Sequence, residues 1–206
     1  MVETKSSRQE NTEQAAIPSY LIRDIIGGKP YYYKGYKEVL NKTKTIHDIM
    51  PSSTLQSFII MYINYLLIQA LGIKEYHIFT SETGSHLAKS ENYGLDLAVY
   101  DKKTLPNNKI GIHFATVPPL LVVEVDIKIE LEDSTDLDFI SKKTQSLLDF
   151  GTKKVIWITS KTKKVLIAEK GKDWILRDWD QDMELMEGVV ANIGKYLKEN
   201  DVVIEN

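Results

Sequence analysis

The chain has 206 residues, of which 43% are hydrophobic and 27% are charged, as in an ordinary globular protein. It contains no cysteine, which excludes disulfide scaffolds, thiol catalysis, zinc–thiolate centres and iron–sulfur clusters. The formal net charge is −3, from 26 Lys and Arg against 29 Asp and Glu. That balance excludes a uniformly basic nucleic-acid coat but permits a local basic patch.

The first 16 residues are polar and mixed in charge, without the apolar core of a secretory signal. We expect them to form a mobile arm, residues 1–16, ahead of a single domain over residues 17–206. Without an export signal or cysteine, the expected compartment is the cytoplasm.

A short helix or extended segment is expected over residues 17–24, followed by a hairpin around the turn Gly27-Gly28. The second run of the hairpin, residues 31–40, is rich in tyrosine. Such tyrosines usually cover a core edge, and the alternative is that they stack on bases or contact a protein partner.

The longest apolar segment, residues 55–71, predicts a buried helix over residues 54–71 rather than a membrane span. Its apolar runs are broken by polar residues and are far shorter than the ~20 residues that cross a bilayer. Ser52 or Ser53 can cap the helix, and Gly72 can end it.

Most of the remaining chain alternates between strand and turn patterns. Strands are expected at residues 75–80, 86–89 and 95–100, with a polar turn at 83–85 between the first two. The segment 120–131 begins apolar on both faces and then alternates from Glu124 onward, which is typical of a strand that leaves the core for a cleft or solvent.

An amphipathic helix over residues 136–150 should connect this strand to a buried strand at residues 155–160 in a right-handed βαβ crossover. The C-terminal part adds a hairpin strand at 164–170, a further strand at 174–179 and a helix at 188–197. Together these elements predict one α/β domain with a mixed central sheet flanked by helices.

Two acidic residues lie in apolar strands, Asp96 within residues 95–100 and Glu124 within residues 120–131. A buried carboxylate is costly unless it is paired or binds a cation. If the two strands are neighbours, the carboxylates converge and a divalent ion relieves their repulsion. Hard oxygen ligands suit Mg²⁺, or alternatively Mn²⁺. The competing interpretation is that each acid sits at a strand end and reaches water.

Two lysines can join these acids. At 100° per residue, Lys143 falls inside the apolar stripe of helix 136–150, whereas Lys142 points away. The stripe is defined by Leu137, Ile140, Thr144, Leu147 and Leu148. Lys143 either serves a site or covers apolar surface with its stem while its ammonium reaches water. Lys128 lies on the polar face of strand 120–131 and is the other candidate.

This pattern resembles the PD-(D/E)XK nuclease superfamily and, more closely, its Uma-type restriction endonuclease domain. The matching stretches run from about residue 20 to 170: IIGGKPYYYKGYKEVL, IMPSSTLQSFII, SETGSHLAKSENYGLDLAVYD, PPLLVVEVDIK and KKTQSLLDFGTKKVIWIT. The resemblance implies a restriction-endonuclease-like fold and Mg²⁺-dependent hydrolysis of phosphodiester bonds in DNA.

Carried onto this chain, the resemblance assigns Asp96 and Glu124 to the metal and Lys143 to catalysis. The chain departs from the family pattern in two places: Leu95 stands where a proline precedes the first acid, and Asp126 stands two residues after Glu124, where the simplest motif has its lysine. Because Asp126 and Lys128 themselves form a D-x-K, they remain alternative catalytic residues.

Residues 141–168 contain seven lysines and one acid, a local charge of +6. Such a face is expected to contact the phosphate backbone, and the alternative is a solvated lysine-rich turn. The candidate nucleic-acid-binding residues are Lys153, Lys154, Lys161, Lys163 and Lys164. The expected function is a metal-dependent DNA endonuclease, working as a homodimer if it cuts both strands. The alternatives are a non-catalytic nucleic-acid-binding module with the same fold and a protein-contact scaffold.

Overall fold

The structure is a computed structural model that describes residues 17–89, 91–126 and 136–204. The expected arm at residues 1–16, the second half of the expected strand 120–131 and the candidate Lys128 therefore lie outside the described residues.

An eight-stranded mixed sheet forms the centre of the molecule, with strand order β2-β1-β4-β5-β6-β7-β8 and with β3 paired to β4. The sheet confirms the predicted fold class. Its strands are β1 (Ile22–Ile26), β2 (Lys29–Tyr32), β3 (Tyr76–Ala88), β4 (Glu91–Asp101), β5 (Leu121–Val125), β6 (Lys154–Thr159), β7 (Lys164–Glu169) and β8 (Ile175–Asp178).

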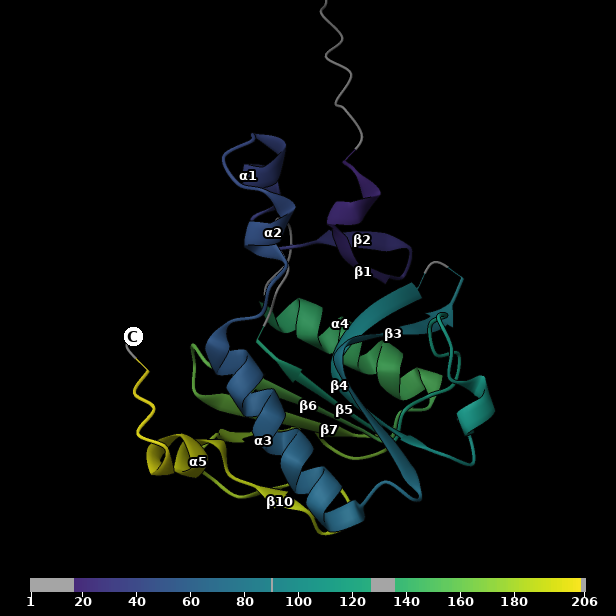
Figure 1. Cartoon of the computed structure of the whole chain (residues 1–206), viewed down its shortest axis with the longest axis vertical. Helices are drawn as coiled ribbons and strands as arrows, with labels where there is room; N and C mark the ends of the chain where they lie inside the picture. Colours follow the sequence, from purple (N-terminus) through teal and green to yellow (C-terminus); the bar gives the residue numbers. More distant parts are fainter. Residues whose placement is uncertain (1–16, 90, 127–135, 205–206) are drawn as a thin grey trace, which may run out of the picture.

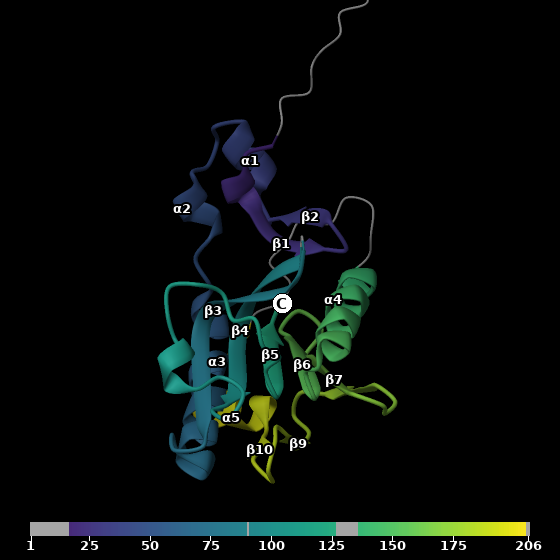
Figure 2. The ribbon, with the colours of Figure 1, turned by 90° about the vertical axis from the view of Figure 1, so that its right-hand side faces the viewer.

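Helices cover both faces of this sheet, with α3 on one face and α4 on the other (Figure 1, Figure 2). The short helices α1 and α2 lie beside the β1–β2 hairpin at one end of the molecule, and α5 lies at the opposite end (Figure 1). The helices are α1 (Tyr36–Leu40), α2 (Ile46–Ile49), α3 (Thr54–Leu71), α4 (Asp136–Phe150) and α5 (Ile193–Glu199). Short 3₁₀ turns occur at Ser19–Leu21 and Asn107–Lys109. A separate two-stranded sheet is formed by β9 (Met183–Glu184) and β10 (Val190–Ala191).

Helix α3 has the predicted bounds and the predicted caps. The Ser53 hydroxyl accepts a hydrogen bond from the backbone N–H of Gln56, and Gly72, at φ +66°, ends the helix. By length and composition alone the helix could cross a membrane. It packs on the sheet through a buried stripe at the helical spacing: Gln56, Ile59, Ile63 and Leu67.

Helix α4 also has the predicted bounds, and it joins the parallel strands β5 and β6. Its buried face contains Lys143 among apolar side chains, as the helical pattern predicts. One part of that prediction is wrong, because Leu137 is 66% exposed and Phe139 is buried instead. Leu137 lies in the first turn of the helix and lines an open hollow beside Trp157 and Thr159, which leaves its side chain exposed.

Three predicted elements need correction. The expected turn at 83–85 lies inside one continuous strand, β3, because positive φ angles at Ser81 and Glu82 absorb the irregularity as a bulge opposite β4. The tyrosine-rich run 31–40 is a strand only as far as Tyr32 and then forms α1. The C-terminal helix begins at Ile193, capped by the Asn192 side chain, because residues 190–191 pair in a strand.

Candidate active site

Asp96 and Glu124 lie on adjacent antiparallel strands. The pairing of β4 with β5 ends at Leu97 and Val123, so the next positions along the same register are Asp96 and Glu124. Both are 1% exposed. Asp96 Oδ2 accepts hydrogen bonds from Gln56 Nε2 and from the Val125 backbone N–H, each at 2.9 Å. The carboxylate thus takes a backbone donor at the point where the strand pairing stops.

Lys143 meets the Glu124 carboxylate from α4. Its ammonium is fully buried and lies 3.0 Å from Glu124 Oε1 and 3.1 Å from Asp24 Oδ2. It also lies over the rings of Tyr93 and Trp157, 5.5 and 5.8 Å from their centroids. Lys142 is exposed, as the helical pattern predicts. The Lys143 ammonium therefore faces acids and aromatic rings rather than solvent.

Two charged residues of β1, Arg23 and Asp24, complete the cluster and were not predicted from the sequence. Asp24 is fully buried and accepts hydrogen bonds from Lys143 Nζ and from the Gly94 backbone N–H. Arg23 Nη1 lies 2.9 Å from Asp24 Oδ2, and Nη2 lies 3.5 Å from Asp96 Oδ1. The available signal was a charged pair inside the apolar run IRDII, which resembles the setting of Asp96 and Glu124.

Two further polar side chains reach Asp96 and Arg23 from other elements. Gln56 is one of the polar residues that interrupt the apolar segment 55–71, and it sits on the buried stripe of α3. Glu82 Oε1 lies 3.7 Å from Arg23 Nη2, because the bulge in β3 turns this side chain toward the cluster.

Burial and charge act in opposite directions on the acids. Burial raises the pKa of Glu124, Lys143 lowers it and Asp96 raises it further, and the result is a pKa of about 7. For Asp24, burial acts to raise the pKa, but Lys143 and Arg23 outweigh it and hold the pKa below its ordinary value. Burial thus brings the protonation of Glu124 close to neutral pH.

The carboxylates of Asp96 and Glu124 are the oxygen ligands that this cluster offers to a metal ion. Glu124 Oε1 has no hydrogen-bond donor among the described residues, because its contact with Lys143 is close but poorly aligned. Within the same residues, no group of three or more His, Cys, Asp or Glu is arranged to hold a metal. Mg²⁺ is commonly bound by one or two carboxylates and retains several waters. Asp96 and Glu124 are the residues that would hold it.

The alternative acid, Asp126, lies at the end of β5 and takes a different partner. Its φ angle is +60°, so the two-residue alternation of the strand stops there. Its carboxylate accepts hydrogen bonds from the backbone N–H and the hydroxyl of Ser160, at 2.6 and 2.8 Å. Asp126 therefore joins the ends of β5 and β6, and its carboxylate does not contact Lys143.

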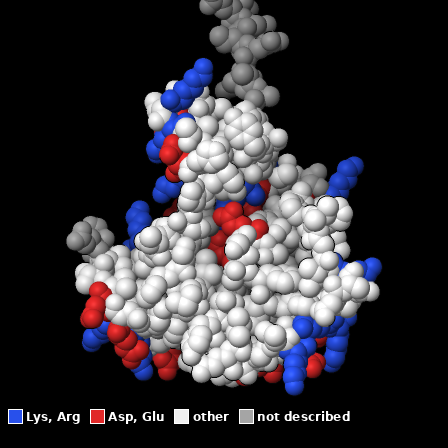
Figure 3. Space-filling model, viewed as in Figure 1, with Lys and Arg blue, Asp and Glu red and all other residues white. Residues whose placement is uncertain are grey.

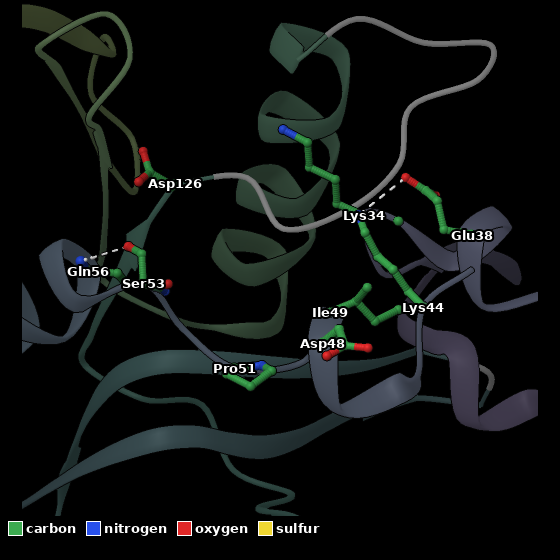
Figure 4. Close-up of a pocket in the computed structure, with 10 residues that line it drawn as sticks. Lys34, Glu38, Lys44, Asp48, Ile49, Pro51, Ser53, Gln56 and Asp126 are labelled. Carbon is green, nitrogen blue, oxygen red and sulfur yellow. Dashed lines mark hydrogen bonds and ion pairs between the residues drawn. The ribbon is translucent and has the colours of Figure 1, made fainter. Parts of the chain in front are cut away.

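Two hollows open beside the buried cluster. One, of about 530 Å³, is lined by residues of α1, α2 and the first turn of α3, together with Lys34 and Asp126 (Figure 4). The other, of about 930 Å³, shares Lys34 and Asp126 and extends to Trp157. Gln56 lines the first hollow and also donates a hydrogen bond to Asp96, so the Asp96 carboxylate lies directly behind the wall of this hollow. Acidic side chains are visible at the centre of this face, below α1 and α2 (Figure 3).

The five candidate nucleic-acid-binding lysines lie on β6, β7 and their connections, but two of them are paired. Lys154 lies 3.1 Å from Glu169, and Lys164 forms an ion pair with Asp178. Lys153 and Lys161 are exposed, and Lys163 is half-buried. The net positive charge of this face is therefore smaller than the sequence count of +6.

The fold is a mixed α/β fold with a buried charged cluster where β4 and β5 stop pairing. Among solved structures, the chain is similar to a protein of Anabaena variabilis ATCC 29413 described as a "putative nuclease belonging to DUF820". The TM-score is 0.62 at 15% sequence identity, and the match covers 87% of this chain and 92% of the other. No family model matches the chain, and no curated protein matches it. At this identity the likeness concerns the fold.

Proposed function

We propose that the protein is a metal-dependent endonuclease that hydrolyses phosphodiester bonds of DNA. The observation that carries the proposal is the meeting of Asp96, Glu124 and Lys143 in a buried cluster of a nuclease-like fold. The chemistry needs a Lewis acid at the phosphate, a positioned water and a cation against the developing charge. The neighbour's description as a "putative nuclease" supports the proposal of a nucleic acid as the substrate.

Each residue has a distinct proposed role. Asp96 and Glu124 would hold Mg²⁺ or Mn²⁺, which supplies the Lewis acid when it is bound. The Lys143 ammonium orients the attacking water and stabilises the negative charge that develops on the phosphate. Gln56 holds Asp96 Oδ2 in place from α3. The rings of Tyr93 and Trp157 restrict the Lys143 side chain to one direction.

One observation favours a second function, a nucleic-acid-binding module that does not cleave. Arg23 and Lys143 already contact the cluster's buried acids, so the site is largely neutralised by the chain itself. The candidate acids are also 1% exposed, so a metal ion and substrate must enter past the wall of the adjoining hollow.

The deciding experiment is a nicking assay on supercoiled plasmid and on single-stranded DNA, with Mg²⁺, with Mn²⁺ and with a chelator. We expect metal-dependent cleavage by the wild-type protein that is lost in Asp96→Asn and in Glu124→Gln. Asp149→Asn is the matched control, because Asp149 is an exposed acid on α4. DNA binding without cleavage in either metal would favour the non-catalytic module.

The proposed function also leads to proposals for the oligomeric state and the cellular location of the protein. Cleavage of both strands of a duplex needs two active sites, so we propose a homodimer if the product is a double-strand break. Nicking by a monomer would instead limit one chain to one strand. Sedimentation of the active protein distinguishes the two assemblies. A DNA substrate is consistent with the cytoplasmic location expected from the sequence.

A further inference from the structure

The Arg23 guanidinium is enclosed by acids at the candidate site. Its side chain is 4% exposed. It lies 2.9 Å from Asp24, 3.5 Å from Asp96 and 3.7 Å from Glu82. Its Nε has no hydrogen-bond acceptor among the described residues. A guanidinium remains protonated in this setting, because the surrounding carboxylates outweigh the effect of burial and raise its pKa.

The two cations divide the cluster between them. Lys143 approaches Glu124 from α4, and Arg23 approaches Asp96 from β1. Both cations contact the same oxygen of Asp24, at 3.1 and 2.9 Å. Each candidate metal-binding carboxylate thus has its own cation, and Asp24 links the pair.

The charge of the buried cluster limits what it can accept. The carboxylates of Asp24, Asp96 and Glu124 contribute −3 when ionised, and Arg23 and Lys143 contribute +2, so the net charge is −1. One divalent ion and one phosphodiester, which carries a single negative charge, bring the total to zero. With Arg23 in place, a second divalent ion would have to lie beside the guanidinium, and unbalanced like charges in a buried site are costly. Glu82, with a side chain 28% exposed, is screened by solvent.

We propose that Arg23 is a positioning residue that occupies the place of a second metal ion, so that each chain binds one divalent cation. The guanidinium holds the Asp24 and Asp96 carboxylates together as a second ion would in a two-metal site. This inference rests on the proposed function, because it requires that Asp96 and Glu124 bind a metal at all.

The test is the number of Mn²⁺ ions bound per chain, measured by calorimetry and by the electron paramagnetic resonance of free Mn²⁺, without DNA. We expect one ion for the wild type and two for Arg23→Gln, because the substitution removes the guanidinium that lies between the Asp24 and Asp96 carboxylates, where a second ion would bind. Arg23→Lys retains the charge and should bind one ion. Arg177→Gln is the matched control, because Arg177 lies on β8 and bonds to the Asp182 carbonyl outside the cluster.

The results separate this inference from the proposed function. A wild-type protein that binds two ions overturns the inference while supporting a metal-dependent nuclease. One ion in both the wild type and a folded Arg23→Gln overturns the inference in the same way. A wild type that binds no Mn²⁺ contradicts the proposed function, and the inference falls with it. If Arg23→Gln does not fold, the ion counts of the wild type and of Arg23→Lys still decide, since two ions in either would overturn the inference.

Discussion

Lys143 lies in a helix stripe that otherwise buries apolar side chains, and its charge is balanced there by acids from two strands. The ammonium contacts Asp24 and Glu124, which come from β1 and β5. Removing one partner of a buried ion pair leaves the other charge uncompensated, which commonly costs more than the pair contributes. We therefore expect the free energy of unfolding to fall sharply when either cation of the cluster is removed, and to fall less when a poorly hydrogen-bonded acid is removed.

We predict that Lys143→Ala lowers the free energy of unfolding by about 3–5 kcal/mol and abolishes cleavage, because two buried carboxylates lose their shared cation. Lys142→Ala, one residue earlier on the exposed side of α4, should change stability by no more than about 0.5 kcal/mol and retain cleavage. Urea unfolding and the nicking assay provide the two measurements. Equal stability of the two variants would show that the Lys143 contacts are energetically unimportant.

Lys143→Met serves as a second variant because it retains most of the side-chain volume. If it folds, its cleavage rate separates loss of the charge from loss of the fold.

Glu124 should make stability depend on pH in an unusual direction. Its folded-state pKa of about 7 lies above the ordinary 4.5, so between these values the native state holds a proton that the unfolded state has lost. Stability from this group is thus fully present below about pH 4.5 and is lost as pH rises through about 7. The pKa difference between the folded and unfolded states corresponds to at most about 3 kcal/mol in the free energy of unfolding.

We therefore predict that, in metal-free buffer, the melting temperature of Glu124→Gln rises relative to the wild type as pH increases from 5 to 8. Asp24 changes stability with pH in the opposite direction, because its pKa is lowered in the folded state. Its contribution to stability is lost only under more acidic conditions. Asp149→Asn should show the same difference from the wild type at both pH values. A Glu124→Gln difference that shrinks toward pH 8 would mean that the wild-type carboxylate is well paired when ionised.

At the scale of elements, the site depends on where strands stop pairing. The β4–β5 ladder ends at Leu97 and Val123, which leaves the Val125 N–H for Asp96. One residue later, Asp126 turns the chain with a positive φ and binds Ser160 at the end of β6. The same short segment thus presents one backbone donor to the site and uses its second acid to join two strands.

We predict that Asp126→Ala lowers the free energy of unfolding by about 1–3 kcal/mol, because two hydrogen bonds are lost and alanine disfavours positive φ. Cleavage should persist in the folded fraction. Asp126→Asn should recover part of the stability, because asparagine tolerates this backbone conformation and keeps one acceptor for Ser160. Loss of cleavage in a stable Asp126→Asn variant would instead identify Asp126 as the second acid.

At the scale of the whole molecule, the cluster is assembled from β1, β4, β5 and α4, with Gln56 added from α3. The hairpin that carries Arg23 and Asp24 pairs with β4 at Ile25 and Asn92. Beyond the cluster, the lysine-bearing face on β6 and β7 is partly neutralised by Glu169 and Asp178. Contact with a phosphate backbone should therefore depend mainly on the lysines that have no acidic partner among the described residues.

We predict that changing Lys153, Lys161 and Lys163 together to Gln reduces the slope of log K against log salt for DNA binding by about 2–3. The matched variant changes the paired lysines, Lys154 and Lys164, and should reduce the slope by less than about 1 because acids already balance them. Binding titrations at several salt concentrations give both slopes. An unchanged slope in the triple variant would exclude this face as the docking surface.

The sequence determined what depends on local pattern. Periodicity and capping residues predicted α3 and α4 with their bounds, because a helix face and its ends are encoded within a few residues. Apolar neighbours marked Asp96 and Glu124 as costly to bury. The inward direction of Lys143 followed from the same helical geometry.

Only the tertiary structure decided which charges meet. Asp24 and Lys143 are 119 positions apart and Arg23 and Asp96 are 73 apart, so no local pattern links them. Their contact depends on where the β1 hairpin joins β4, which is set by packing across the whole sheet. The positive φ angles at Glu82 and Asp126 also depend on pairing with neighbouring strands. Alternation along the strand predicts that Asp126 and Glu124 share one face. In the folded chain the positive φ angle at Asp126 ends that alternation, and the Asp126 carboxylate accepts hydrogen bonds from Ser160 instead.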